Sequence, residues 1–141
     1  MNTKEKQQKD IEMLNERFGK DTLLSLATID GSRPTVRIVN AYFEDGSFYT
    51  IVDAKSEKLK QIKQNRLVGV CSNEYFSAHG IAVNLGQFCN DEENELARKI
   101  KNIYSAWWED EFRNIEKAVL QIKLTDAVFF DFQTRYVMDF D

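Results

Sequence analysis

The stretch TLLSLATIDGSRPTVRIVNAYFEDGSFYTIVDAKSEKLKQIKQNRLVGV (residues 22–70) decides the fold class of this chain. Within it, LLSLATI (23–29) predicts a strand with so few polar side chains that we expect both of its faces to be covered. Asp30-Gly31 then predicts a tight turn, and residues 33–43 predict the returning strand. The stretch therefore opens with a β-hairpin.

A second turn, at Glu44-Asp45-Gly46, leads into a third predicted strand, SFYTIV (47–52). Residues 55–65, KSEKLKQIKQN, predict a short helix that Asp53 or Ser56 can cap. Three consecutive strands joined by tight turns favour an antiparallel sheet over a parallel one.

Helix and strand patterns continue on both sides of this stretch. Residues 3–19 predict an amphipathic helix, because Ile11, Leu14 and Phe18 fall on one face. The other predicted elements are strands at 67–72 and 81–88, a longer helix capped by Asp91, a strand pair around Thr125-Asp126 within 118–132, and a strand at 136–140. The order predicts a mainly β protein with peripheral helices, an antiparallel β-barrel in one domain over residues 1–141.

Charge, cysteine and histidine usage argue against several functions. The net charge is −4 and no dense basic stretch is present, so we expect no nucleic-acid binding. The polar N-terminus and the lack of a long apolar run predict no membrane segment and a cytoplasmic location. Cys71 and Cys89 form no CxxC pair, which argues against a disulfide scaffold or a structural zinc site. With His79 as the sole histidine and no GxSxG motif, we expect no metal site and can name no catalytic residue.

Residues 37–58 suggest a binding site for an anion. Arg37 lies among apolar residues in the middle of a predicted strand, where a charge needs a partner or an anionic ligand. Hydroxyl groups follow on the next strand, and cations with a further hydroxyl stand at the positive N-terminus of the following helix. The residues concerned are Tyr49 and Thr50 on the strand, and Lys55, Ser56 and Lys58 at the helix. Arg37, Thr50, Ser56 and Lys58 can converge on one phosphate dianion.

The same residues have a simpler interpretation. A lysine-rich helix such as KSEKLKQIKQN often exposes its charges to solvent, and Arg37 can be an edge-strand charge that opposes aggregation. Residue types alone leave both interpretations open.

Residues 22–70 resemble the FMN-binding split-barrel family of pyridoxamine phosphate oxidase-like proteins. The matching positions are Leu26-Ala27-Thr28, Asp30, Gly31, Pro34, Arg37, Val39, Gly46, Tyr49, Thr50, Ser56, Lys58, Ile62, Asn65 and Val68, and the strand that ends in Gly86 is similar as well. The later part of the chain resembles the general stress protein subgroup. The resemblance implies an antiparallel split β-barrel that binds FMN.

The resemblance also implies roles for individual residues. Arg37 and Lys58 would clamp the FMN phosphate with help from Ser56 and Thr50. The backbone of Arg37, Ile38, Val39 and Asn40 would run beside the edge of the isoalloxazine. In this family each FMN lies between two subunits, so the resemblance implies a homodimer. Trp107 or Trp108 either stacks on the ring or packs the long helix against the barrel.

The chain departs from the family's pattern at several positions. Tyr42 stands where the oxidases carry a lysine for the substrate phosphate, and Glu57 stands where they carry an arginine. The C-terminal Arg-x-His element has no counterpart, and Ile81 falls near a glutamine that often touches the flavin. These departures argue against oxidation of vitamin B6, and the charge of Glu57 predicts weaker FMN binding.

The sequence therefore predicts an FMN-dependent oxidoreductase that acts on a small, unidentified substrate. One alternative is a non-catalytic flavin-binding or sensing protein. Another is the same barrel with haem or a deazaflavin in place of FMN, in which case His79 is the only conventional nitrogen ligand for a haem.

Overall fold

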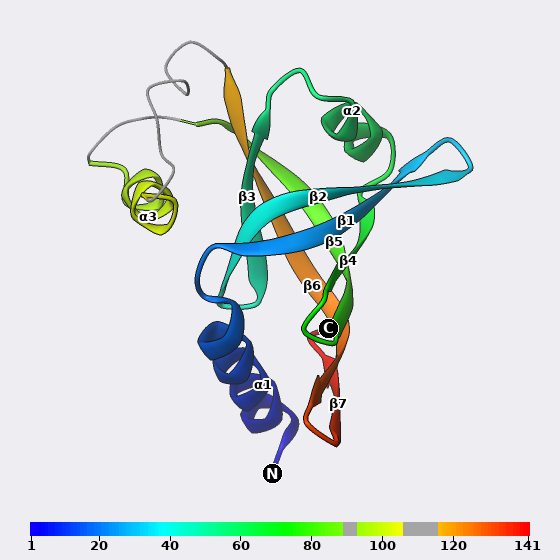
Figure 1. Cartoon of the computed structure of the whole chain (residues 1–141), viewed down its shortest axis with the longest axis vertical. Helices are drawn as coiled ribbons and strands as arrows, with labels where there is room; N and C mark the ends of the chain where they lie inside the picture. Colours follow the sequence, from blue (N-terminus) through cyan, green and yellow to red (C-terminus); the bar gives the residue numbers. More distant parts are fainter. Residues whose placement is uncertain (89–92, 106–115) are drawn as a thin grey trace.

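The computed structural model describes residues 1–88, 93–105 and 116–141 (Figure 1). The helices are α1 (Thr3–Phe18), α2 (Glu57–Gln64) and α3 (Glu95–Ile103). The strands are β1 (Thr22–Asp30), β2 (Arg33–Glu44), β3 (Ser47–Asp53), β4 (Leu67–Ser72), β5 (Phe76–Gln87), β6 (Lys117–Asp131) and β7 (Thr134–Asp139). No helix in these ranges is long and apolar enough to cross a membrane.

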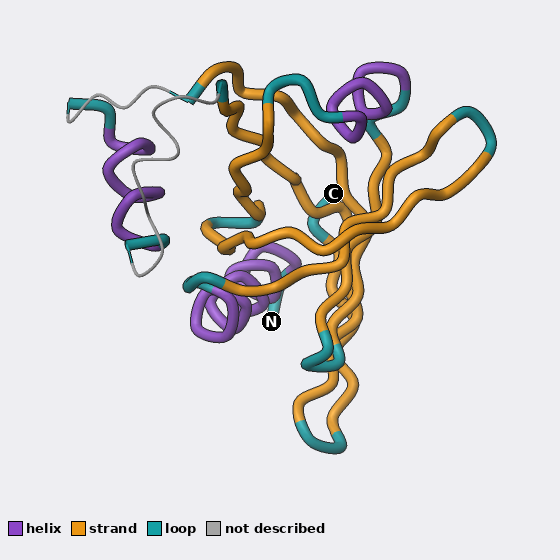
Figure 2. The backbone as a smooth tube through the Cα atoms, turned by 45° about the horizontal axis from the view of Figure 1, so that its top comes forward, coloured by secondary structure: helices purple, strands orange, loops and turns teal. Residues whose placement is uncertain are grey.

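The strands form one antiparallel barrel. They follow each other in the order β3-β2-β1-β4-β5-β6, and a pairing between β3 and β6 closes the ring. β7 pairs only with β6 and extends below the barrel as the second arm of a hairpin (Figure 2). The predicted mainly β, antiparallel barrel with peripheral helices is confirmed.

The turn residues explain the first two hairpins. The β1–β2 register ends at the pair Asp30 and Arg33, so its loop has two residues, and Gly31 there has φ of 64°. The β2–β3 loop consists of Asp45 and Gly46, with φ of 48° and 95°. Two positive φ values in succession are typical of a type I′ turn, whose twist matches that of the strands.

The C-terminal strands differ from the prediction. Residues 118–132 do not form a strand pair, because β6 runs unbroken through Thr125-Asp126 and turns only after Asp131. The irregularity at this point is a shift in the β5–β6 register between His79 and Gly80. A bulge absorbs an extra residue without ending the strand, so polar residues at this position do not make a turn.

The predicted long helix also begins later than expected. Its N-cap is Asn94, whose side chain accepts a hydrogen bond from the backbone of Ala97. The predicted cap Asp91, together with Trp107 and Trp108, lies outside the described residues.

Aromatic side chains fill the barrel, and α1 closes its lower end. Phe18 of α1 packs 4.9 Å from the ring of Phe76 and 6.0 Å from those of Phe48 and Phe129. Gly19 ends α1, and a Cβ at this position would meet the carbonyl oxygen of Asn15, so the close approach requires glycine.

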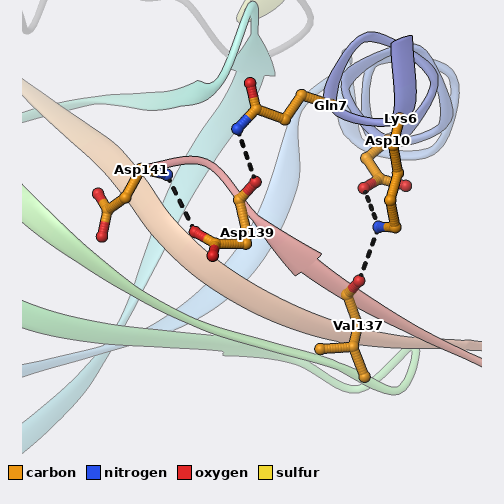
Figure 3. A network of polar contacts seen from close by, with 6 residues as sticks. All are labelled: Lys6, Gln7, Asp10, Val137, Asp139 and Asp141. Carbon is orange, nitrogen blue, oxygen red and sulfur yellow. Dashed lines mark hydrogen bonds and ion pairs between the residues drawn. The ribbon is translucent and has the colours of Figure 1, made fainter. Parts of the chain in front are cut away.

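Polar contacts tie α1 to β7 (Figure 3). The Nζ of Lys6 donates to Asp10 at 2.8 Å and to the carbonyl of Val137 at 2.9 Å, and Gln7 donates to the carbonyl of Asp139. Asp10 is buried, and an unpaired buried carboxylate would lower the stability of the fold, so the ion pair with Lys6 offsets this cost.

The described residues leave one face of the β2-β1-β4 sheet uncovered. Its large apolar side chains are Leu23, Val36, Ile38 and Leu67, which are 61%, 65%, 69% and 59% exposed. We call these four residues the open face. The expectation that both faces of β1 are covered is therefore not met by one copy of the chain, in which Leu24 and Leu26 are buried but Leu23 is not.

Candidate functional site

A cavity of about 330 Å³ lies where β2 and β3 separate. Only three residue pairs join these strands, and the last of them is Tyr42 with Tyr49. Beyond that point β3 continues to pair with β6 as far as Asp53 and Lys117. The cavity is lined by Ile38, Val39, Asn40, Ile51, Val52, Asp53, Lys58, Tyr104 and Lys117.

Side chains replace the missing backbone pairing at the mouth of this split. The carbonyl oxygen of Asn40 accepts a hydrogen bond of 2.6 Å from the hydroxyl of Thr50 and one of 3.1 Å from that of Tyr104. Both lone pairs of this oxygen are thus used without an amide from β3. The carbonyl needs no further donor, which allows the two strands to separate.

Cations are concentrated beside the cavity. Lys58, from the first turn of α2, lines it, and the pKa of its ammonium is lowered, first by burial and then by the charge of Arg37. Lys117 lowers this pKa further, whereas Asp53 raises it. Like charges held together and partly removed from water favour the binding of an anion, because the anion relieves their repulsion.

Arg37 is held rigidly on the neighbouring strand. Its Nη1 donates to the carbonyl of Leu26 at 3.2 Å and to the hydroxyl of Thr28 at 2.7 Å, and its Nη2 donates to Oε1 of Gln61 at 3.1 Å. Burial lowers the pKa of the guanidinium. These bonds occupy three of its five N–H groups, and the other two have no partner among the described residues and can bond a ligand.

Ser56 adds a buried hydroxyl at the same end of α2. It is the N-cap residue, but its side chain makes no capping hydrogen bond, and its Oγ has no partner among the described residues. A buried hydroxyl normally has a partner, and the N-terminus of a helix attracts negative charge. Ser56 is therefore suited to receive an anionic oxygen.

The other predicted site residues lie elsewhere or are already bonded. The hydroxyl of Thr50 is buried and gives its only proton to Asn40. Tyr49 accepts a hydrogen bond from Gln121 and stacks on Tyr42. Lys55 is exposed, and its backbone N–H bonds the carboxylate of Asp53. None of Tyr49, Thr50 and Lys55 lines the cavity.

The structure thus brings together Ile38, Val39, Asn40 and Lys58 as lining residues, whereas Arg37 and Ser56 do not line the cavity. Both are linked to Lys58, because the charge of Arg37 lowers its pKa and Ser56 is the N-cap of the helix that carries it. Sequence reasoning missed Tyr104 and Lys117 and treated Asp53 only as a cap. For Tyr104 a signal existed, because it follows Ile100 by four residues and so shares the buried face of α3.

Two departures from the family's pattern concern residues that do not line the cavity. Tyr42 is buried in a small cluster with Ile100, Tyr104 and Val119, and its hydroxyl has no partner among the described residues. Burial raises the pKa of this phenol far above its usual range. Glu57 is exposed and pairs with Lys60 at 3.1 Å, so part of its charge is neutralised.

His79 is also separate from the cavity. It stands on the exposed side of β5, 78% exposed, and its Nδ1 lies 2.8 Å from Oδ1 of Asp126. This hydrogen bond to His79 lowers the pKa of the Asp126 carboxylate. Among the lining residues there is no histidine or cysteine, and the described part of the chain contains no cluster of potential metal ligands.

Comparison with known proteins identifies the fold. No family model matches the sequence, and no curated protein matches it significantly. Solved structures do match. General Stress Protein 26 from Bacillus anthracis has a TM-score of 0.66 at 14% identity, over 92% of this chain and 98% of its own. A pyridoxamine 5′-phosphate oxidase-like protein from Listeria innocua has a TM-score of 0.60 at 18% identity, over 92% of this chain and 96% of its own. A NimC/NimA family protein from Clostridium acetobutylicum has a TM-score of 0.62 at 19% identity, over 95% of this chain and 92% of its own.

Other structures with this fold are named for their ligands. They include an FAD-binding protein from Mesorhizobium loti (TM-score 0.60), an F420 reductase (0.59) and a haem-binding protein from Mycobacterium smegmatis (0.64). Identities of 12–15% to these proteins show a shared fold and no more. The chain therefore has the split-barrel fold that flavin-binding proteins use, as its resemblance predicted.

Proposed function

We propose that this chain binds FMN in the cavity between β2 and β3 and serves as a flavin-dependent oxidoreductase for a small substrate. The observation that carries the proposal is the group formed by Arg37, Lys58 and Ser56. Arg37 and Lys58 are partly buried cations, and the charge of Arg37 acts on Lys58. Ser56 is the N-cap of the helix that carries Lys58, and its buried hydroxyl has no partner among the described residues. A phosphate dianion satisfies all three, and proteins of this fold are named for flavin ligands.

Each residue has a distinct task in this proposal. Arg37 offers its two remaining N–H groups to the phosphate from a fixed position, Lys58 supplies a second charge, and Ser56 donates its hydroxyl. Residues 38–40 line the cavity, and in this proposal their backbone would run beside the edge of the flavin. The bound flavin would supply the electron transfer, while the protein binds and orients it.

A homodimer is part of the proposal because the cavity adjoins the open face. Ile38 is 69% exposed, belongs to the open face and also lines the cavity. Four large apolar side chains grouped on one sheet are expected to be covered by a partner. A second copy packed there would form the outer wall of the cavity, so the site would be shared between subunits.

The site favours a flavin over a haem and argues against vitamin B6 oxidation. No histidine lines the cavity, and His79 already bonds Asp126 outside it. Tyr42, which replaces the substrate lysine of the oxidases, is buried beneath α3.

A comparison of FMN with riboflavin tests the proposal, since the two differ only in the phosphate. Fluorescence titration should show that the protein binds FMN at least tenfold more tightly than riboflavin, because charge-assisted hydrogen bonds contribute about 1.5–3 kcal/mol each. Arg37→Ala should remove most of this difference, whereas Lys9→Ala on the exposed side of α1 should preserve it. Equal affinity for FMN and riboflavin, or no binding of either, would contradict the proposed site.

Reduction of the FMN-loaded protein by NADPH, followed by reoxidation with an added acceptor, separates catalysis from sensing. Turnover supports the oxidoreductase. If the protein binds flavin but the flavin does not turn over with NADPH or a chemical reductant and the added acceptor, a sensing protein is favoured instead.

A further inference from the structure

A second cavity, of about 450 Å³, lies between α2 and β5. It shares no lining residue with the cavity between β2 and β3. Its floor is apolar, and the side chains that form it are Ala54, Leu59, Ile62, Ala82 and Val83. Leu59 and Ile62 belong to the inward side of α2, and Ala82 to the inward side of β5.

The rim of this second cavity is cationic. Lys60, Lys63 and Arg66 line it together with Asn84, and no carboxylate does. Lys60 pairs with Glu57 at 3.1 Å. Lys63 and Arg66 are exposed and have no ion-pair partner within residues 1–88, 93–105 and 116–141.

The two features together restrict the ligand. An apolar cavity of this size accommodates the body of a small organic molecule, but an inorganic anion gains nothing from the floor. A neutral apolar molecule gains nothing from Lys63 and Arg66, whereas a carboxylate or sulfonate pairs with them. The ligand that uses both is an anion with an apolar body.

We propose that the second cavity binds a small amphiphilic organic anion, such as an aromatic or medium-chain aliphatic carboxylate. The apolar body enters between Leu59, Ile62 and Val83, and the acidic group remains at the rim beside Lys63 and Arg66. The proposal does not depend on flavin binding at the first cavity.

The test uses the fluorescent probe 8-anilinonaphthalene-1-sulfonate with the purified protein. We expect one saturable site per chain, from which decanoate displaces the probe. Decanol has the same apolar body without the charge, so it should compete at least fivefold less well. Equal competition by decanol, or no binding of the probe because a second copy of the chain covers the cavity, would overturn the proposal.

Variants assign the binding to this cavity. The double variant Lys63→Gln/Arg66→Gln should weaken decanoate binding about fivefold to tenfold, because exposed charge pairs contribute about 0.5 kcal/mol or slightly more each. Val83→Phe should abolish binding by filling the cavity. Two control variants make the same changes outside the cavity: Lys9→Gln/Arg135→Gln for the charge variant and Val128→Phe for the cavity-filling one. Both should bind decanoate as the wild type does.

Unchanged decanoate binding in both the charge variant and Val83→Phe would place the probe elsewhere and refute the assignment. FMN titration of the same variants keeps the two sites apart, because their flavin affinity should equal that of the wild type whichever way the decanoate result falls.

Discussion

The hydroxyl of Thr50 donates a hydrogen bond of 2.6 Å to the carbonyl of Asn40, just beyond the point where backbone pairing between β2 and β3 stops. The hydroxyl of Tyr104 bonds the same carbonyl at 3.1 Å. Because β3 separates from β2 here, the carbonyl of Asn40 has no backbone partner on β3. The two hydroxyls bond it instead, so the cavity can form without an unsatisfied backbone group.

Replacement of Lys58 should separate stability from binding. The lowered pKa of Lys58 means that its charge is destabilising in the flavin-free protein. Lys58→Met should therefore raise the free energy of unfolding, by at most about 1 kcal/mol because the side chain is only half-buried, yet weaken FMN binding about tenfold. Urea unfolding and flavin titration measure the two effects, and Lys9→Met is the matched control. A variant that loses stability and retains affinity would remove Lys58 from the site.

FMN affinity should fall at alkaline pH. Lys58 is charged below its pKa, which lies under the ordinary value of 10.5, and it loses its charge as the pH rises through that lowered pKa. Over the same interval the flavin-free protein should become more stable, because the unfolded chain still holds a proton that the folded chain has released. Titrations between about pH 7 and pH 10 test this. Lys58→Arg keeps its charge throughout this range, so a decline just as steep in that variant would show that another group is responsible.

Two tyrosines of one cluster should respond in opposite directions to loss of the hydroxyl. Tyr104→Phe removes the hydrogen bond to Asn40 and should cost about 1 kcal/mol of unfolding free energy. Tyr42→Phe removes a buried hydroxyl that has no partner among the described residues and should stabilise the protein by about 1 kcal/mol. Chemical denaturation compares both with the wild type. Destabilisation by Tyr42→Phe would reveal a partner for that hydroxyl.

The proposed dimer should be broken by one charge on the open face. Val36→Glu would bury an unpaired carboxylate between the copies, which costs several kcal/mol, so the protein should sediment as a monomer and bind FMN less tightly. Val137→Glu makes the same change on β7, where Val137 is 53% exposed, and should leave the dimer intact. A wild-type protein that sediments as a flavin-loaded monomer would exclude the shared site.

Much of the fold was predictable because its determinants are local. The turn residues Asp30-Gly31 and Asp45-Gly46 specify the first two hairpins, and the alternation of apolar residues gives each strand an inner face. The same local rule failed at Thr125-Asp126, where the pairing of β6 with β5 continues past residues that often form turns. Pairing over many residues stabilises a long strand more than one polar dipeptide disfavours it.

The candidate site was only partly predictable. Arg37, Ser56 and Lys58 are close in sequence, and their chemistry suggested an anion site before any geometry was known. Tyr104 comes from a helix distant in the chain, and Lys117 enters only because β6 closes the barrel against β3. Thr50 was predicted as a site residue, but its hydroxyl bonds the carbonyl of Asn40 instead. The sequence could not show this, because only the separation of β2 and β3 leaves that carbonyl without a backbone partner on β3.

The sequence by itself determined the strand order of the first hairpins, the antiparallel class and the cationic character of the segment around α2, since these follow from local turn chemistry, periodicity and charge. Only the tertiary structure decided where the cavity lies, that the hydroxyl of Ser56 has no partner among the described residues, and that these residues leave one side of β1 uncovered. Those properties depend on barrel closure between β3 and β6, a contact between residues about 70 positions apart that no local pattern encodes.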